Sequence, residues 1–138
     1  MIVTILWRLE GSPAAKEASG FHDVPASMYY ADAVAWAAEN DIVNGCGGGR
    51  FAADDAITRE QLAAILYRYS RYCGQSTAVT ASLEGFSDAG SVSGYAREAL
   101  AWAYEAGIVR GTSGNRINPA GFATRAETAA MLHRYLKK

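Results

Sequence analysis

The residues whose types and spacing point most clearly to chemistry are two Thr-Arg pairs, Thr58-Arg59 and Thr124-Arg125. Each pair precedes an amphipathic stretch, and a Gln or Glu follows the threonine by three residues. In a capping box of this spacing, the Thr oxygen accepts from the third amide of a helix, while the Gln or Glu side chain turns back to the Thr amide. The sequence therefore predicts four helix-capping residues: Thr58, Gln61, Thr124 and Glu127.

The capping box leaves Arg59 and Arg125 unexplained. A cation in the first turn of a helix faces the positive end of the helix dipole, which is mildly unfavourable. Its recurrence in both places indicates that each guanidinium has a partner. That partner is either structural, such as Asp23 or Asp88, or a ligand anion, because helix-start amides beside an Arg can bind one. The residues leave both alternatives open.

Catalysis is not predicted, because an enzyme needs a constellation of acid, base or nucleophile, and the sequence contains no motif of that kind. The acidic pair at 54–55 becomes Ala-Gly 66 residues later, and no nucleophile elbow, phosphate loop or HExxH motif occurs. The histidines and cysteines lack metal-ligand spacing, so no metal or cofactor is expected, and the cysteines are interpreted as independent thiols. These residues are His22, His133, Cys46 and Cys73.

The overall charge excludes other classes of partner. A net charge of -1 argues against nucleic-acid binding and against an anionic membrane surface, which would need a basic excess. No apolar window is long enough to span a bilayer. The start of the chain lacks a basic region before its apolar run, so a signal peptide is expected to lie outside this sequence.

The elements that must position these residues form a repeat. When the chain is shifted by 66 residues, residues 29–69 align with 95–135 without a gap, and 18 of 41 positions are identical. Each copy predicts an apolar, Trp-containing helix, a Gly-rich loop and a second, amphipathic helix. The predicted helices are 31–40 and 59–72 in one copy, and 96–106 and 125–136 in the other.

A shift of 60 residues places the N-terminal segment 5–9 on 65–69, so we expect the chain to open inside the last helix of an earlier copy. Its expected packing stripe is Ile2, Ile5, Leu6 and Leu9. The predicted organisation is a tail plus linker at 1–20, a repeat at 21–73, a linker at 74–85 and a repeat at 86–138.

Five short motifs occur in the same order in both copies: Phe-x-Asp, Tyr before the first helix, Ile-Val-x-Gly, Thr-Arg, and Leu-x-Arg-Tyr. This order resembles the S-layer homology (SLH) module of bacterial surface proteins, and "TRAE" at 124–127 matches the family signature letter for letter. The resemblance implies an all-α fold of tandem SLH repeats, with two main helices per repeat joined by a Gly-rich loop. It also implies a pseudo-threefold helical bundle with prongs.

The resemblance further implies a noncatalytic anchor on the outer surface of a bacterium that binds secondary cell wall polysaccharide, such as one with a pyruvylated sugar. Arg59 and Arg125 would bind the carboxylate of the sugar. The rest of each groove would come from Asp23 and Asp88, Tyr29 and Tyr95, and Gly45 and Gly111. Two alternatives stay open: a helical interaction or oligomerisation module without glycan binding, and self-association that completes the partial first copy.

Overall fold

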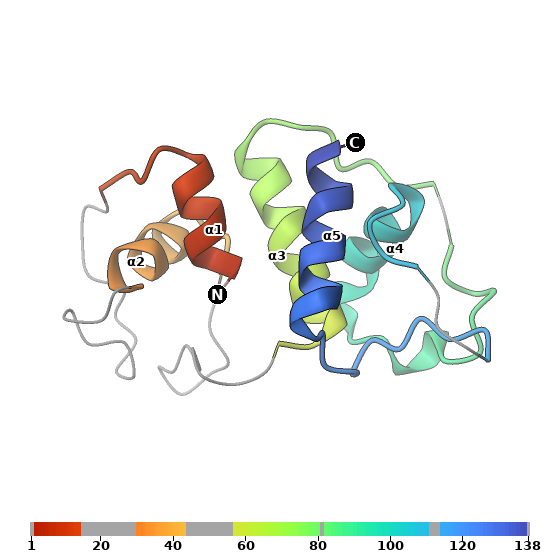
Figure 1. Ribbon diagram of the computed structural model, residues 1–138. Coiled ribbons are helices and arrows are strands. Elements are labelled where there is room, and N and C mark those ends of the chain that lie inside the picture. The colour runs from red at the N-terminus through yellow and green to blue at the C-terminus, as the bar shows by residue number, and fades with distance from the viewer. Residues whose placement is uncertain (1, 15–29, 44–56, 81, 111–113, 138) are drawn as a thin grey trace. The chain divides into compact units, whose positions relative to one another are not determined.

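The computed structural model describes residues 2–14, 30–43, 57–80, 82–110 and 114–137. These ranges contain five α-helices, two short 3-10 helices and no strand, which confirms the all-α prediction (Figure 1). The chain divides into two compact units, residues 1–55 and residues 56–138. The pseudo-threefold bundle with prongs stays a prediction.

The first unit pairs helix α1 (Ile2–Leu9) with helix α2 (Ala31–Glu39). Five consecutive α2 residues are buried, from Ala33 to Ala37, as expected for an Ala-rich helix that is apolar on nearly every face. Helix α2 stops where Asp41 takes a φ of 59° and the Ile42 amide donates to the Ala37 carbonyl at 2.8 Å.

Helix α1 does not bury the stripe that the alignment predicts. Ile2 and Leu6 are buried, but Ile5 and Leu9 are 38% and 48% exposed, and Val3 is buried in their place. The stripe prediction was wrong for these two residues. The reason is that apolar side chains occupy most positions of this short helix, so periodicity alone cannot select the face that packs.

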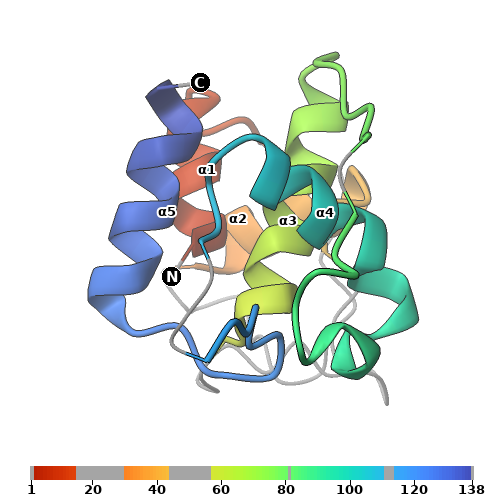
Figure 2. The same ribbon diagram turned by 90° about the vertical axis from the view of Figure 1, so that its right-hand side faces the viewer.

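The second unit contains helix α3 (Arg59–Tyr72), the 3-10 helices η1 (Ala89–Ser91) and η2 (Gly94–Ala96), helix α4 (Arg97–Glu105) and helix α5 (Arg125–Lys137) (Figure 2). Helix α4 buries the run from Ala99 to Ala103. It ends at Gly107, whose φ is 78°, with the Ile108 amide donating to the Ala103 carbonyl at 2.8 Å. This is the same stop that α2 makes, which shows that the repeat extends to the backbone.

Packing in the second unit joins the two sequence copies. Helix α3, from one copy, contacts α4 of the next, and the Tyr67 and Trp102 rings meet edge to face with centroids 5.7 Å apart. Helix α3 also meets α5, where the buried Ser70 and Tyr135 hydroxyls form a 2.8 Å hydrogen bond. The packed unit therefore does not coincide with one sequence copy, because it joins the second helix of one copy to both helices of the next.

The segment that enters α3 pairs with the segment that enters α5. Thr58 and Phe122 form an isolated antiparallel bridge, in which the Ala123 amide donates to the Ile57 carbonyl at 2.8 Å and the Arg59 amide donates to the Gly121 carbonyl at 2.9 Å. The two Thr-Arg motifs therefore start their helices side by side.

Candidate functional site

The structure describes one of the two predicted arginine sites. Of the other arginine, Arg125, the structure describes the backbone and not the side chain. Four further predicted residues lie outside the described ranges: Asp23, Tyr29, Gly45 and Gly111. Cys46 also lies outside them, while Cys73 is the exposed C-terminal cap residue of α3. The site is therefore built around Arg59.

The start of α3 has a complete capping box. The Gln61 amide donates to the Thr58 Oγ1 at 3.2 Å, and the Thr58 amide donates to the Gln61 Oε1 at 2.9 Å. The next two amides, of Arg59 and Glu60, donate to the Gly121 and Pro119 carbonyls. Because protein groups occupy these amides, the start of α3 is not the open anion site that we considered from the sequence. Any anion here must be met by side chains.

The Arg59 side chain is 8% exposed and makes three hydrogen bonds to the following sequence copy. Its Nε donates to the Ile117 carbonyl at 3.1 Å, and its Nη2 donates to the Arg110 carbonyl at 2.7 Å. Its Nη1 donates to the Glu127 Oε2 at 3.1 Å. The two carbonyls fix the plane of the guanidinium, which compensates for the burial of a charged side chain.

The structural partner of Arg59 is Glu127, and not Asp88, which was one of the two partners that we considered. Glu127 is also the third residue of the capping segment of α5, where its amide donates to the Thr124 Oγ1 at 3.1 Å. The Glu127 carboxylate accepts from the Thr124 hydroxyl through Oε1 at 3.2 Å and from Arg59 through Oε2. One carboxylate thus joins the start of α5 to the start of α3.

A pocket of about 320 Å³ opens beside this ion pair within the second unit. Three guanidinium groups and one carboxylate line it, so its charge is predominantly positive. Arg134, on α5, donates to the Ile108 carbonyl at 3.2 Å, and Arg110 is exposed. The lining residues are Arg59, Val109, Arg110, Asn118, Glu127, Ala130, Met131 and Arg134.

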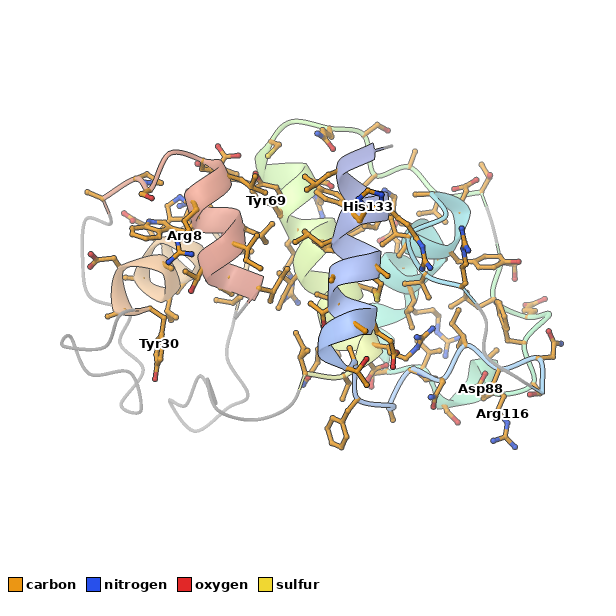
Figure 3. All side chains as sticks on the ribbon, viewed as in Figure 1. Arg8, Tyr30, Tyr69, Asp88, Arg116 and His133 are labelled. Atoms are coloured by element: carbon orange, nitrogen blue, oxygen red, sulfur yellow. The ribbon has the colours of Figure 1, made fainter. Side chains whose placement is uncertain are left out.

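Asp88 supports the loop that carries the Ile117 carbonyl. Its two carboxylate oxygens accept from the Ile117 amide at 2.9 Å and from the Asn118 amide at 2.8 Å. Partial burial by itself raises the pKa of Asp88, but the Ile117 and Asn118 amides and the charge of Arg116 outweigh it and hold the pKa below its ordinary value of 3.8. Asp88 and Arg116 lie together at one end of the unit (Figure 3). Asp88 thus acts on Arg59 through the loop.

The turn after Ile117 has a tight geometry. Asn118 has a φ of 54°, a left-handed conformation that Asn tolerates better than most residues. A Cβ on Gly121 would collide with the Asn118 side-chain amide, so a larger residue at 121 would displace Asn118 from the pocket lining. The residue types at 118 and 121 therefore hold the turn whose carbonyls accept hydrogen bonds from the first amides of α3.

Tyr95 lies away from the lining of the pocket. It is 55% exposed and follows Ser93, whose amide and hydroxyl both donate to the buried Glu60 carboxylate, at 3.0 and 2.6 Å. Partial burial, followed by the charge of Glu60, raises the pKa of Tyr95 above its ordinary value of 10.0, and Arg68 opposes the rise. The structure does not bring Tyr95 together with Arg59.

Sequence reasoning missed the three other polar residues that line the pocket with Arg59 and Glu127. Arg134 did carry a signal, because the Leu-x-Arg-Tyr motif occurs twice. Arg110 and Asn118 carried none, since the other copy has Asn44 and Ala52 at these positions. Within the described ranges, no group of three or more His, Cys, Asp or Glu residues could hold a metal ion. In the part of the chain that the structure describes, no helix is both long and apolar enough to cross a membrane.

Comparison with known proteins gives a family match over both copies. Residues 20–63 and 85–129 match the S-layer homology domain. An amylopullulanase from Thermoanaerobacterium thermosulfurigenes is 37% identical over 118 residues, which are 86% of this chain and 6% of the relative. The exoglucanase XynX from Acetivibrio thermocellus is 33% identical over 86% of this chain and 11% of its own length. The surface-layer 125 kDa protein of Lysinibacillus sphaericus is 32% identical over 85% of this chain and 10% of its own length.

The chain spans 6 to 11% of these relatives, so their enzymatic activities are statements about those larger proteins. S-layer homology domains are themselves noncatalytic modules of cell-surface proteins, and they bind cell wall polymers. The family match covers both copies, and the helices, stops and Thr-Arg segments that the structure describes repeat accordingly. This chain belongs to the S-layer homology domain family.

Proposed function

We propose that this chain anchors its protein to the bacterial cell wall by binding an anionic secondary cell wall polysaccharide in the Arg59 pocket. A carboxylate on the sugar, such as that of a pyruvate ketal, is the group that the pocket recognises. The observation that carries this proposal is the buried Arg59 guanidinium, which lies in a pocket with Arg110 and Arg134 and faces one carboxylate.

The hydrogen bonds of Arg59 leave it able to bind a ligand. An Arg side chain has five N–H donors, and the described residues use one on each of its three nitrogens. One donor therefore remains on each terminal nitrogen. Because two backbone carbonyls already fix the guanidinium plane, a ligand carboxylate would meet a preorganised donor pair and lose less conformational entropy on binding.

The size of the pocket favours a single sugar residue. A volume of about 320 Å³ is at the small end of ligand sites, so one substituted sugar would fill it while the rest of the polymer stays outside. Met131 and Val109, which are almost fully buried, form the apolar base of the pocket, and the arginines offer charge to the carboxylate of the sugar. This combination suits a ketal, which joins an apolar methyl group to a carboxylate.

We extend the proposal to a second site at Arg125 on the strength of the shared motif. Asp23, Tyr29, Gly45 and Gly111 belong to the grooves in this proposal, together with Asp88, whereas Tyr95 stays outside the Arg59 pocket. The contacts of Asp88 support the loop that holds Arg59, so its proposed role is to position the arginine rather than to touch the sugar.

The test replaces Arg110 by Gln, because the Arg110 side chain is exposed and only its backbone carbonyl holds Arg59. The probe is a purified wall polysaccharide that carries pyruvate ketals, and binding is followed by calorimetry. We expect Arg110→Gln to weaken binding by roughly tenfold, the value of one charged contact, at an unchanged melting temperature.

The matched control is Arg97→Gln, which removes an exposed arginine of α4 that does not line the pocket. This variant should bind as the wild type does. Equal binding by Arg110→Gln and the wild type would contradict the assignment of the pocket. Equal binding of a polysaccharide stripped of its ketals by mild acid would contradict the carboxylate as the recognised group.

The second candidate function is a helical interaction or oligomerisation module in which Arg59 is purely structural. The observation that favours it is the ion pair to Glu127, which gives Arg59 a role without any ligand. This candidate expects that purified wall material does not sediment the protein, and that the Arg110→Gln substitution changes nothing in that assay.

A further inference from the structure

The carboxylate in the Arg59 pocket belongs to the protein itself. Glu127 accepts from Arg59 at 3.1 Å, and both residues line the pocket. The two side chains are unequally accessible, since Arg59 is 8% exposed and Glu127 is 41% exposed. A ligand that approaches from solvent therefore meets Glu127 before it meets the guanidinium.

We propose that Glu127 is an internal competitor of the ligand: its carboxylate already accepts from Nη1 of Arg59, and unless it moves away it repels a ligand carboxylate that binds the other donors of the two terminal nitrogens. The inference rests on the proposed function of the same pocket. In this inference, Glu127 lowers the affinity of the pocket for anions. Only a ligand whose carboxylate binds Arg59 more tightly than Glu127 does can displace it.

Electrostatics gives the direction of the effect. Two carboxylates that share one guanidinium repel each other at short range, and the repulsion is strongest where water is excluded. While Glu127 stays in place, a ligand carboxylate gains contact with Arg59 at the expense of that repulsion. Removing the negative charge at 127 should therefore strengthen binding of anions.

Displacement of Glu127 costs little in the helix cap. The backbone part of the cap is the Glu127 amide, which donates to the Thr124 Oγ1 and does not depend on the position of the carboxylate. The carboxylate contact to the Thr124 hydroxyl, through Oε1, is exposed. The half-exposed Glu127 carboxylate can rotate into solvent, and the ligand carboxylate then replaces it as the partner of the buried Arg59 guanidinium.

The chain itself supplies the variant that tests this role. Gln61 is at the position of α3 that corresponds to Glu127 in α5, and it closes a complete capping box. Glu127→Gln should therefore retain the cap and leave an amide oxygen for Arg59, while removing only the negative charge.

The experiment measures binding of the ketal-bearing wall polysaccharide to the wild type and to Glu127→Gln, and repeats both with the polysaccharide stripped of its ketals. We expect the substitution to tighten binding of the ketal-bearing probe by roughly three- to tenfold, the range of one screened charge contact. Binding of the stripped probe should not change, and circular dichroism should show the same helix content. The matched control Gln61→Glu adds the charge in the other capping box, which does not line this pocket, and should leave binding of both probes unchanged.

The outcomes separate the two proposals. If the wild type binds the ketal-bearing probe and Glu127→Gln binds it equally or more weakly, the competitor role is wrong while the proposed function stands. Tighter binding of both probes would also overturn the competitor role, because the gain would not depend on a carboxylate. If neither protein binds either probe, the proposed function itself is overturned.

Discussion

The starts of α3 and α5 carry the same motif and use it differently. At α3, the Gln61 side chain accepts from the Thr58 amide and the Thr58 Oγ1 accepts from the Gln61 amide, so both bonds of the box are local. At α5, the Glu127 carboxylate accepts from the Thr124 hydroxyl and reaches across to Arg59 in the other copy. The box residue is an amide at α3 and a carboxylate at α5, and the carboxylate adds a contact between copies to its local bonds.

The largest effect that we expect in this comparison comes from Arg59→Ala. The substitution deletes the three side-chain hydrogen bonds of Arg59 to the following copy and leaves the carbonyl of the buried Ile117 without its donor. Unfolding free energy should fall by about 2 to 4 kcal/mol, as for loss of a buried, hydrogen-bonded charge.

Urea unfolding followed by circular dichroism measures this change, and Arg97→Ala serves as the control because Arg97 is exposed. A loss for Arg59→Ala no larger than that of the control would mean that the start of α3 does not depend on the contact between copies. The contact between the two helix starts would then contribute nothing to the unfolding free energy.

An intermediate effect is expected for Asp88→Asn, which weakens the loop that supplies the Ile117 carbonyl to Arg59. At neutral pH the substitution should cost about 1 to 2 kcal/mol, because a charged acceptor of two amides is replaced by a neutral one.

The pH dependence of this cost has a definite sign. Since the pKa of Asp88 is lowered on folding, its contribution is fully present above the ordinary value of 3.8 and is lost as the pH falls through the lower, folded-state value. Unfolding curves between pH 7 and pH 2 should therefore show the wild type and Asp88→Asn converging in acid. A difference that stays constant down to pH 2 would contradict the role of the charge.

The smallest effects are expected when the two box residues are exchanged singly. Gln61→Glu keeps the cap and adds a negative charge near the helix start, so stability should change by no more than about 0.5 kcal/mol.

Glu127→Gln removes the ion pair to Arg59 and should cost about 1 kcal/mol, within the range of partly exposed pairs. Thermal unfolding of the two single variants measures both values. If the two substitutions lower the unfolding free energy equally, the ion pair between Glu127 and Arg59 does not contribute to the difference between the two capping boxes.

The sequence predicted those parts of this site that depend on local spacing. Helix positions followed from apolar periodicity, and the Thr58 cap followed from a three-residue interval. Arg59 was singled out because its charge is unfavourable at a helix start. Its true partners were not predictable, because two of them are backbone carbonyls, which every residue has, and the third is 68 residues away.

The same limit explains why Asp88 is not the partner of Arg59 and why the expected stripe of α1 was wrong for two residues. Asp88 was a reasonable partner for an arginine by charge, yet the Ile117 and Asn118 amides occupy its carboxylate, and no sequence pattern marks an amide as available. Helix α1 offered too many apolar residues for the stripe to be assigned, so the exposed Ile5 and Leu9 followed from packing rather than from pattern.

The long sequence separation of the Arg59 contacts has a consequence for folding. Helix α3 can form from neighbouring residues, but the carbonyls of Arg110 and Ile117 are 51 and 58 residues away, so the chain must close a long loop before they reach it. We therefore expect the pocket to assemble late, after the helices, and to open first when the unit begins to unfold. A protein that has lost only this loop closure would keep its helical spectrum and have no pocket.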